Sequence, residues 1–179
     1  MRKIMLLLAL LPLCAFARDW NVDMAKSSLG FDGTYQGGAF AGKFGKFSAG
    51  ITYDETDLDH AKFDVTVDLG SVDTGSGERD QTLATADFFD TAKFPQAHFV
   101  TSAFNRGADG GVIAQGMLTI RDQSKPVMLA VKFAVNGGAT TLDVNTTLER
   151  MDFGLGTSSD WADIGRKINV HGHLVLTPK

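Results

Sequence analysis

Apolar and polar residues alternate along most of the chain after about residue 29. In the clearest run, KFDVTVDL at positions 62 to 69, Phe, Val and Leu alternate with Lys, Asp and Thr. A period of two is that of an extended strand, whose successive side chains lie on opposite faces of a sheet. The pattern therefore predicts strands with one buried and one solvated face, which is typical of antiparallel sheets.

Eight runs of this kind are separated by turn signals such as Asn-Arg-Gly and Asn-Gly-Gly, with no strand–helix–strand rhythm. The predicted strands cover residues 29–35, 47–53, 62–69, 97–104, 112–120, 127–135, 142–148 and 168–176. The segment GGAFAGKF at positions 37 to 44 resembles a phosphate-binding loop but ends in Phe44 rather than Ser or Thr, so it is interpreted as a hairpin turn. Eight antiparallel strands either close into a barrel or stack as a sandwich, and a barrel of that size encloses side chains or one small ligand.

The stretch from Glu78 to Phe99 does not fit this pattern. Asp80 is expected to cap a short helix through Ala86, and Pro95 ends any helical segment. The three aromatic residues that follow the helix need a buried position: Phe88, Phe89 and Phe94. They either plug one end of the β-structure or line the entrance to a cavity inside it.

The first 17 residues have the features of a cleaved signal peptide. Arg2 and Lys3 precede an apolar run, and Ala-Phe-Ala at positions 15 to 17 fits a small-x-small cleavage site. Cys14 is the sole cysteine, but Leu13 before it is larger than lipoprotein processing prefers. We therefore expect residues 18–179 to be exported to the periplasm as a single domain without disulfides.

Charge and cysteine content exclude several classes of function. Removing Arg2 and Lys3 from the 17 basic residues leaves 15 against 21 acidic residues, so the net charge becomes −6 with histidines neutral. Nucleic acid and anionic membrane surfaces attract clustered cations, so neither is an expected partner. Thiolate metal sites and thiol catalysis need cysteine, which the mature chain lacks.

Candidate chemistry is sparse. His171 and His173 lie two residues apart on one strand face, which suits a metal, yet that face is expected to be a solvated one without a carboxylate cluster. No nucleophile motif or pair of carboxylates is spaced for catalysis, so we expect no enzyme, no metal and no cofactor. Arg79 lies in the aromatic stretch, and Arg150 lies just before a Gly-, Ser- and Asp-rich segment from Asp152 to Asp163, which we call the late loop. The two arginines either brace these connections or bind a polar head group.

Taken together, a series of short motifs across nearly the whole mature chain resembles the YceI-like family of lipid-binding or polyisoprenoid-binding proteins. In chain order the motifs are Trp20-x-Val22-Asp23, Gly42-x-Phe44, Ile51-x-Tyr53-Asp54, Ser71-Val72-x-Thr74-Gly75, Arg79-Asp80-x-x-Leu83, Phe88-Phe89-Asp90, Phe94-Pro95-x-x-x-Phe99, Gly116-x-Leu118-Thr119-Ile120, Lys125-x-Val127, Arg150-x-Asp152-Phe153-Gly154 and Ile164-Gly165. The Gly- and Lys-rich segment at positions 37 to 47 departs from the family pattern.

The resemblance implies an all-β, eight-stranded, lipocalin-like antiparallel barrel with a short helix and the aromatic connection between its third and fourth strands. It also implies a periplasmic carrier that holds a long apolar lipid, such as a polyprenyl chain or quinone precursor, in an internal tunnel. The lining would come from Phe31, Tyr35, Phe47, Ile51, Phe63, Val65, Val67, Phe88, Phe89, Phe94, Phe99, Leu118, Leu129, Val131, Phe133, Val144 and Val170. Arg79 and Arg150 would be the head-group candidates. In this view the aromatic stretch lines or gates the tunnel.

The resemblance also implies a possible homodimer and a possible membrane cytochrome b561-type partner. Two alternatives stay open at this point. A redox-linked or structural partner of such a cytochrome would have a filled core and an exposed apolar patch. An isomerase or hydrolase acting on a lipid would need a polar group inside the tunnel, for which Tyr35, Tyr53 and Asp32 are the early candidates.

Overall fold

The computed structural model describes residues 17–137 and 139–179, so all of the predicted signal peptide except Ala17 lies outside the described residues. The described part consists mainly of strands, with one α-helix and four 3₁₀ turns. The strands are β1 (Arg18–Val22), β2 (Ser28–Tyr35), β3 (Gly38–Phe44), β4 (Phe47–Tyr53), β5 (Lys62–Asp68), β6 (Val72–Asp73), β7 (Gln96–Arg106), β8 (Val112–Ile120), β9 (Gln123–Asn136), β10 (Ala139–Glu149) and β11 (Lys167–Pro178). The helix is α1 (Gly77–Ala84), and the 3₁₀ turns are η1 (Leu58–His60), η2 (Leu69–Ser71), η3 (Arg150–Phe153) and η4 (Ser159–Trp161).

The strands form a closed antiparallel ring. They follow the order β1-β4-β5-β7-β8-β9-β10-β11, and β11 pairs with β1 again to close the sheet. β2 also pairs with β11, and β3 pairs with β2, so β1 and β2 occupy one position of the ring while β3 and β4 occupy the next. The result is the eight-stranded barrel that was predicted, and closure decides between barrel and sandwich.

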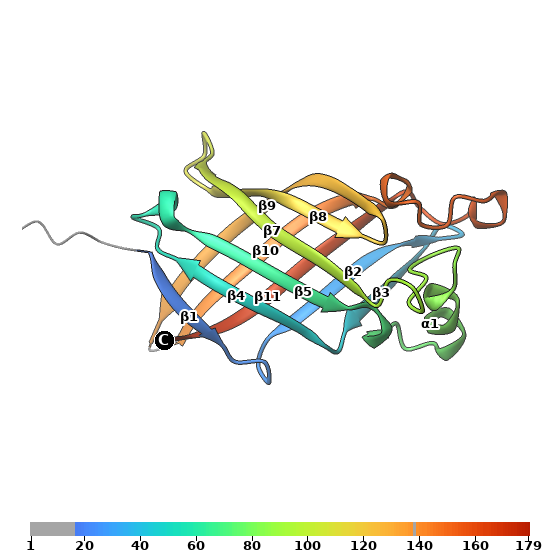
Figure 1. The fold of residues 1–179 in the computed structure, drawn as a ribbon, viewed down its shortest axis with the longest axis horizontal. Coiled ribbons are helices and arrows are strands. Elements are labelled where there is room, and N and C mark those ends of the chain that lie inside the picture. Colours follow the sequence, from blue (N-terminus) through green and yellow to red (C-terminus); the bar gives the residue numbers. More distant parts are fainter. Residues whose placement is uncertain (1–16, 138) are drawn as a thin grey trace, which may run out of the picture.

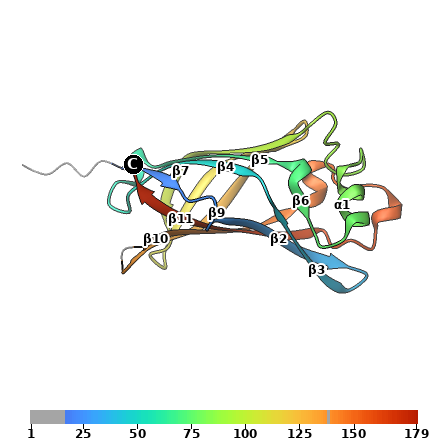
Figure 2. The same cartoon turned by 90° about the horizontal axis from the view of Figure 1, so that it is seen from below.

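The barrel is longer than it is wide. Helix α1 covers one end, whereas β1 and the C-terminus lie at the opposite end (Figure 1). Seen from below, β4, β5 and β7 run along one wall, and β2, β3, β10 and β11 along the other (Figure 2). We call the two ends the α1 end and the β1 end.

The segment at positions 37 to 44 is a strand, which corrects the prediction of a turn there. The turn is confined to Gln36 and Gly37, whose φ angles of 50° and 76° suit a two-residue hairpin connection. Gly38–Phe44 then pairs with β2 along its whole length. Gly42 lies directly under the ring of Phe31 on β2, where there is no room for a β-carbon. A glycine is therefore required here for packing and not for a turn.

The helix begins earlier than expected. The hydroxyl of Ser76 accepts a hydrogen bond from the backbone N–H of Arg79, so Ser76 is the N-cap in place of Asp80. Asp80 lies inside the first turn, where its carboxylate accepts hydrogen bonds from the backbone N–H and the hydroxyl of Thr74 at 2.9 and 2.7 Å. These bonds fix α1 to the segment that precedes it. Within the described residues, no helix is long and apolar enough to cross a membrane.

Candidate functional site

The inner face of the barrel carries two separate apolar clusters. The β1-end cluster has ten buried members: Ile51, Tyr53, Phe63, Phe104, Val112, Ala114, Val131, Leu142, Leu174 and Leu176. The α1-end cluster has five: Leu69, Phe89, Ala97, Ile120 and Phe153. Each cluster closes one end of the barrel with tightly packed side chains.

Between the clusters, inward-facing side chains keep part of their surface exposed. Val65 lies between Phe63, which belongs to the β1-end cluster, and Val67, which packs against the α1-end cluster, yet Val65 itself is only half-buried. Val170 and Thr146, cross-strand neighbours on β11 and β10, are half-buried as well, although both also border a hollow on the outer face of the barrel. Because a closed core leaves few voids, we infer from the incomplete burial of inward-facing residues that side chains pack the middle section less completely than either end. This middle section is the candidate binding site.

The predicted lining residues fall into three groups. Buried residues are Phe31, Ile51, Phe63, Phe88, Phe89, Phe99 and Val131. Half-buried residues are Phe47, Val65, Val67, Phe94, Leu118, Leu129, Phe133, Val144 and Val170. Tyr35 is 45% exposed at the end of β2, so its assignment to the lining is wrong. The pairing of β2 with β11 ends at Asp32, and Tyr35 lies three residues beyond it, where β2 pairs with β3.

The two adjacent phenylalanines of the aromatic connection point to different places. The Phe89 ring belongs to the α1-end cluster and lies 6.1 Å from the Phe44 ring. The Phe88 ring meets Trp161 edge-on, with ring centroids 5.0 Å apart, and lies against Gly156 of the late loop. Phe89 therefore plugs the α1 end, and Phe88 packs beneath the loop instead of lining the middle section. The plug alternative describes both residues better than the gate.

Four further hydrogen bonds, two of them made by Arg121, hold the aromatic connection against the late loop. The indole Nε1 of Trp161 donates to the Asp87 carboxylate at 3.0 Å, and the backbone N–H of Gly156 donates to the Asp87 carbonyl at 2.6 Å. Arg121, at the turn between β8 and β9, donates to the carbonyls of Phe88 and Gly154. Arg121 could not be recognised from local sequence, because its partners lie 33 residues away in both directions.

Arg150 organises the late loop and is not available to a head group. It is only 6% exposed, and burial lowers the pKa of its guanidinium. Its N–H groups donate to five backbone carbonyls, those of Leu155, Gly156, Trp161, Ile164 and Gly165. An arginine has five such donors, so none remains for a ligand. The bracing alternative is the one the structure supports.

Arg79 occupies a different position from Arg150. Its guanidinium carbon lies 5.5 Å from the centre of the Phe40 ring on β3, and Nη1 donates a long 3.5 Å hydrogen bond to the Thr74 carbonyl. The side chain is half-buried at the α1 end. The structure thus separates the two head-group candidates and gives Arg79 a stacking role on Phe40.

At the β1 end, Tyr53 is enclosed by aromatic rings. The centroids of Phe63, Phe104 and Phe133 lie 5.8, 6.0 and 5.2 Å from that of Tyr53. Desolvation raises the pKa of the Tyr53 hydroxyl to about 12, with Glu55 and Asp54 adding to the effect. Phe104 and Trp20, which also pack here, were not among the predicted lining residues.

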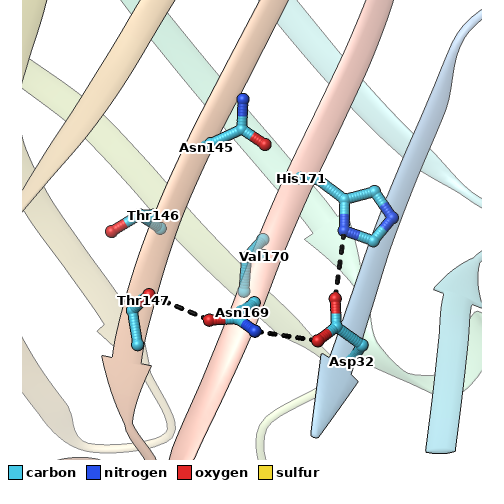
Figure 3. Close-up of a pocket in the computed structure, with 7 residues that line it drawn as sticks. All are labelled: Asp32, Asn145, Thr146, Thr147, Asn169, Val170 and His171. Atoms are coloured by element: carbon cyan, nitrogen blue, oxygen red, sulfur yellow. Dashed lines mark hydrogen bonds and ion pairs between the residues drawn. The ribbon is translucent and has the colours of Figure 1, made fainter.

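The outer face of β10, β11 and β2 carries a shallow polar hollow of about 410 Å³ (Figure 3). Within it, Thr147 donates to Asn169 at 2.9 Å, and Asn169 donates to Asp32 at 2.8 Å. Nδ1 of His171 lies 3.8 Å from the same Asp32 carboxylate. The hollow is a chain of polar side chains on the solvated face, as alternation predicts for these strands.

Both late histidines are exposed, as expected, and each faces a carboxylate from a neighbouring strand. Nδ1 of His173 donates to Asp143 at 2.6 Å, whereas Nδ1 of His171 lies 3.8 Å from Asp32. These partners were missed because strand register, not sequence distance, brings them together. Within residues 17–137 and 139–179, no group of three or more His, Cys, Asp or Glu side chains is placed to hold a metal.

The three residues considered for lipid chemistry do not meet. Asp32 lies in the outer hollow, Tyr35 is exposed at the end of β2, and Tyr53 is buried in the β1-end cluster. The wall of the barrel separates Asp32 from the interior. The geometry therefore suits enclosure of an apolar molecule better than acid–base chemistry on one.

The sequence matches the model of the YceI-like domain over residues 20–176. A UPF0312 protein of Vibrio vulnificus (strain YJ016) is 30% identical over 175 residues, which is 93% of each chain. A UPF0312 protein of Shewanella baltica (strain OS185) is 34% identical over 123 residues, covering 67% of this chain and 64% of the relative.

Solved structures show the same barrel. The crystal structure of Burkholderia cenocepacia BcnA has a TM-score of 0.80 and 30% sequence identity, covering 88% of this chain and 100% of that one. A polyisoprenoid binding domain from Saccharophagus degradans, implicated in plant cell wall breakdown, has a TM-score of 0.66 at 16% identity, covering 92% and 100% of the two chains. At that identity the likeness extends to the fold alone.

Proposed function

Because the chain belongs to the YceI-like family, we propose that it binds a long apolar lipid, with an isoprenoid chain as the first candidate, inside its barrel. The observation that carries the proposal is the half-buried middle section between two packed clusters. The name of the Saccharophagus degradans domain, which describes polyisoprenoid binding on the same fold, supports the choice of ligand class.

The physical basis is burial of hydrocarbon. Each CH₂ group removed from water contributes roughly 0.8 kcal/mol, so a long chain needs only a dry enclosure of sufficient length. Val65, Val144 and Val170 supply apolar surface to the middle section from three different strands. Selectivity would then come from the length of the space and from a few polar groups at its ends. Binding of this kind involves no bond making or breaking, so we propose a carrier and not an enzyme.

We further propose that the protein acts in the periplasm after removal of residues 1–17. The basic start, the apolar run and the Ala-Phe-Ala site motivate this proposal. Cell fractionation and N-terminal sequencing of the exported protein test it. A mature chain beginning at Arg18 is expected, whereas cytoplasmic protein that retains Met1 would overturn it.

A test of lipid binding uses native mass spectrometry and solvent extraction of the purified mature protein. An isoprenoid or other long-chain lipid is expected to leave with the extract. Protein that carries no lipid and takes up none from detergent-dispersed isoprenoids would exclude the proposal.

A matched pair of variants on β5 locates the ligand. Val65→Phe adds bulk to the middle section, whereas Thr66→Phe adds the same ring to the outward face of the same strand. If the middle section is open, Val65→Phe reduces lipid retention about tenfold or more and costs less than about 1 kcal/mol of stability. In a filled interior the same change would cost about 1–3 kcal/mol through overpacking. Thr66→Phe is expected to leave retention unchanged.

A further inference from the structure

The hydroxyl of Tyr53 is a buried polar group without a partner in the described part of the chain. Tyr53 is 0% exposed, and its Oη makes no hydrogen bond to any described residue. Leaving a hydroxyl unpaired in an apolar environment costs about 1–3 kcal/mol, and Phe would fill the same space without that cost. A tyrosine here is thus unfavourable for folding unless something outside the chain accepts a hydrogen bond from its hydroxyl.

The three phenylalanine rings around Tyr53, which we call the aromatic cage, contain no hydrogen-bond acceptor for its hydroxyl. Phe63, Phe104 and Phe133 supply rings, and the nearby Trp20 indole N–H is a donor. That indole is already used, since it donates to the backbone carbonyl of Tyr53 at 2.9 Å. Tyr53 has no exposed surface, so a partner from the barrel interior reaches its hydroxyl only when side chains of the β1-end cluster move aside.

The chemistry of the site restricts that partner. Like any tyrosine hydroxyl at neutral pH, that of Tyr53 is protonated, so it can donate a hydrogen bond to an acceptor. Asp54 and Glu55 follow Tyr53 in the sequence, and their negative charges raise its pKa, although Arg106 opposes them. An anionic group would be repelled by these carboxylates and would lose its hydration inside the ring cage. A neutral oxygen, such as that of a carbonyl or ether, fits both conditions.

We propose that Tyr53 is a binding residue that donates a hydrogen bond to a neutral oxygen of the lipid, at the β1 end of the barrel. The inference rests on the proposed function, since it requires a lipid in the middle section. The proposal also orients the ligand: the aromatic cage opens to admit the oxygen-bearing end, and the hydrocarbon extends through the middle section toward the α1 end.

Two isoprenoid probes of the same shape test the proposal. Phytone is a saturated isoprenoid methyl ketone, and pristane is the hydrocarbon in which a methyl group replaces the ketone oxygen. Binding of each to the full mature protein is measured by competition with a fluorescent fatty probe, for the wild type, Tyr53→Phe and Tyr35→Phe. Tyr35 is the matched control, because it is the other tyrosine and its hydroxyl lies at the exposed end of β2.

We expect Tyr53→Phe to lose about 3- to 10-fold in affinity for phytone and nothing for pristane, because one hydrogen bond is removed and the shape is kept. Tyr35→Phe should change neither affinity. The unliganded Tyr53→Phe protein should be at least as stable as the wild type, which separates a binding role from a structural one.

Three results would overturn the proposal. An equal loss for both probes would mean that Tyr53 acts through packing alone. Unchanged affinity for both probes would mean that the hydroxyl meets no ligand oxygen and is satisfied by a buried water. Lack of binding of either probe to the wild type would overturn the proposed function, and this inference with it. In the first two cases lipid binding itself would stand.

Discussion

Asp87 and Trp161 lie 74 residues apart in the sequence, and the indole Nε1 of Trp161 donates a 3.0 Å hydrogen bond to the Asp87 carboxylate. The same indole packs edge-on against Phe88, next to Asp87. Through these two contacts, Trp161 joins the late loop to the aromatic connection, the two irregular segments at the α1 end. The closure of that end depends on contacts between loops, in contrast to the strand ladders that form the wall.

Replacing Trp161 with Phe is expected to cost about 1 kcal/mol of stability, since the ring contact with Phe88 is partly kept and the hydrogen bond is lost. Trp161→Ala should cost about 2–3 kcal/mol, because both contacts are lost. Urea unfolding measures both values. Asp160→Ala is a suitable control on an exposed neighbour, and an equal cost for that variant would show that the loop contacts are not specific.

Phe89→Ala is expected to cost about 3–5 kcal/mol, because Phe89 is 8% exposed and its removal leaves a cavity in the α1-end cluster. Phe94→Ala, at a half-buried position in the same connection, should cost less. Thermal and chemical unfolding are the measurements. If Phe89→Ala instead abolished lipid retention and left stability unchanged, Phe89 would be a gate and not a plug.

Arg150→Ala is expected to cost about 3–5 kcal/mol, because it leaves five loop carbonyls without their donor. Arg150→Lys should recover only part of this stability, since an ammonium has three donors and lacks the planar fork. Arg166→Ala is the control: Arg166 is exposed and forms one ion pair, with Glu149, at 3.7 Å. A small cost for Arg150→Ala together with a large loss of lipid would revive the head-group role.

His60 and Asp57 should show a mutual dependence of their titrations. Their 2.7 Å hydrogen bond raises the pKa of the His60 imidazole and lowers that of the Asp57 carboxyl. The stabilisation from His60 is fully present below its unfolded pKa of about 6.5 and is lost as the pH rises through its higher folded pKa. The stabilisation from Asp57 is present above its unfolded pKa of about 3.9 and is lost as the pH falls through its lower folded pKa.

An NMR titration of the His60 ring checks this dependence. In Asp57→Asn, the His60 pKa is expected to fall toward about 6.5, because the charged acceptor is gone. Asp59→Asn should lower it less, since Asp59 acts on His60 only through a smaller charge effect. An unchanged His60 midpoint in Asp57→Asn would contradict the assignment.

The alternation of apolar and polar residues was sufficient to predict most strands of the barrel wall. Alternation places Phe63, Val65 and Val67 on one face of β5, and the register with β4 and β7 confirms that these side chains share the inner face. The prediction failed where a local signal had two explanations. Gly37 and Gly42 were both attributed to a turn, although Gly42 is needed to accommodate the ring of Phe31.

By itself, the sequence determined the class of fold and the sorting of side chains into an inner and an outer face, because a period of two follows from the geometry of each strand. Only the tertiary structure decided the roles of Arg150 and Tyr53. The carbonyls that saturate Arg150 come from a loop folded back over it, and the cage around Tyr53 comes from β5, β7 and β9. Whether a buried polar group has a hydrogen-bond partner depends on residues distant in the chain. Only the folded barrel shows whether such a partner lies within reach.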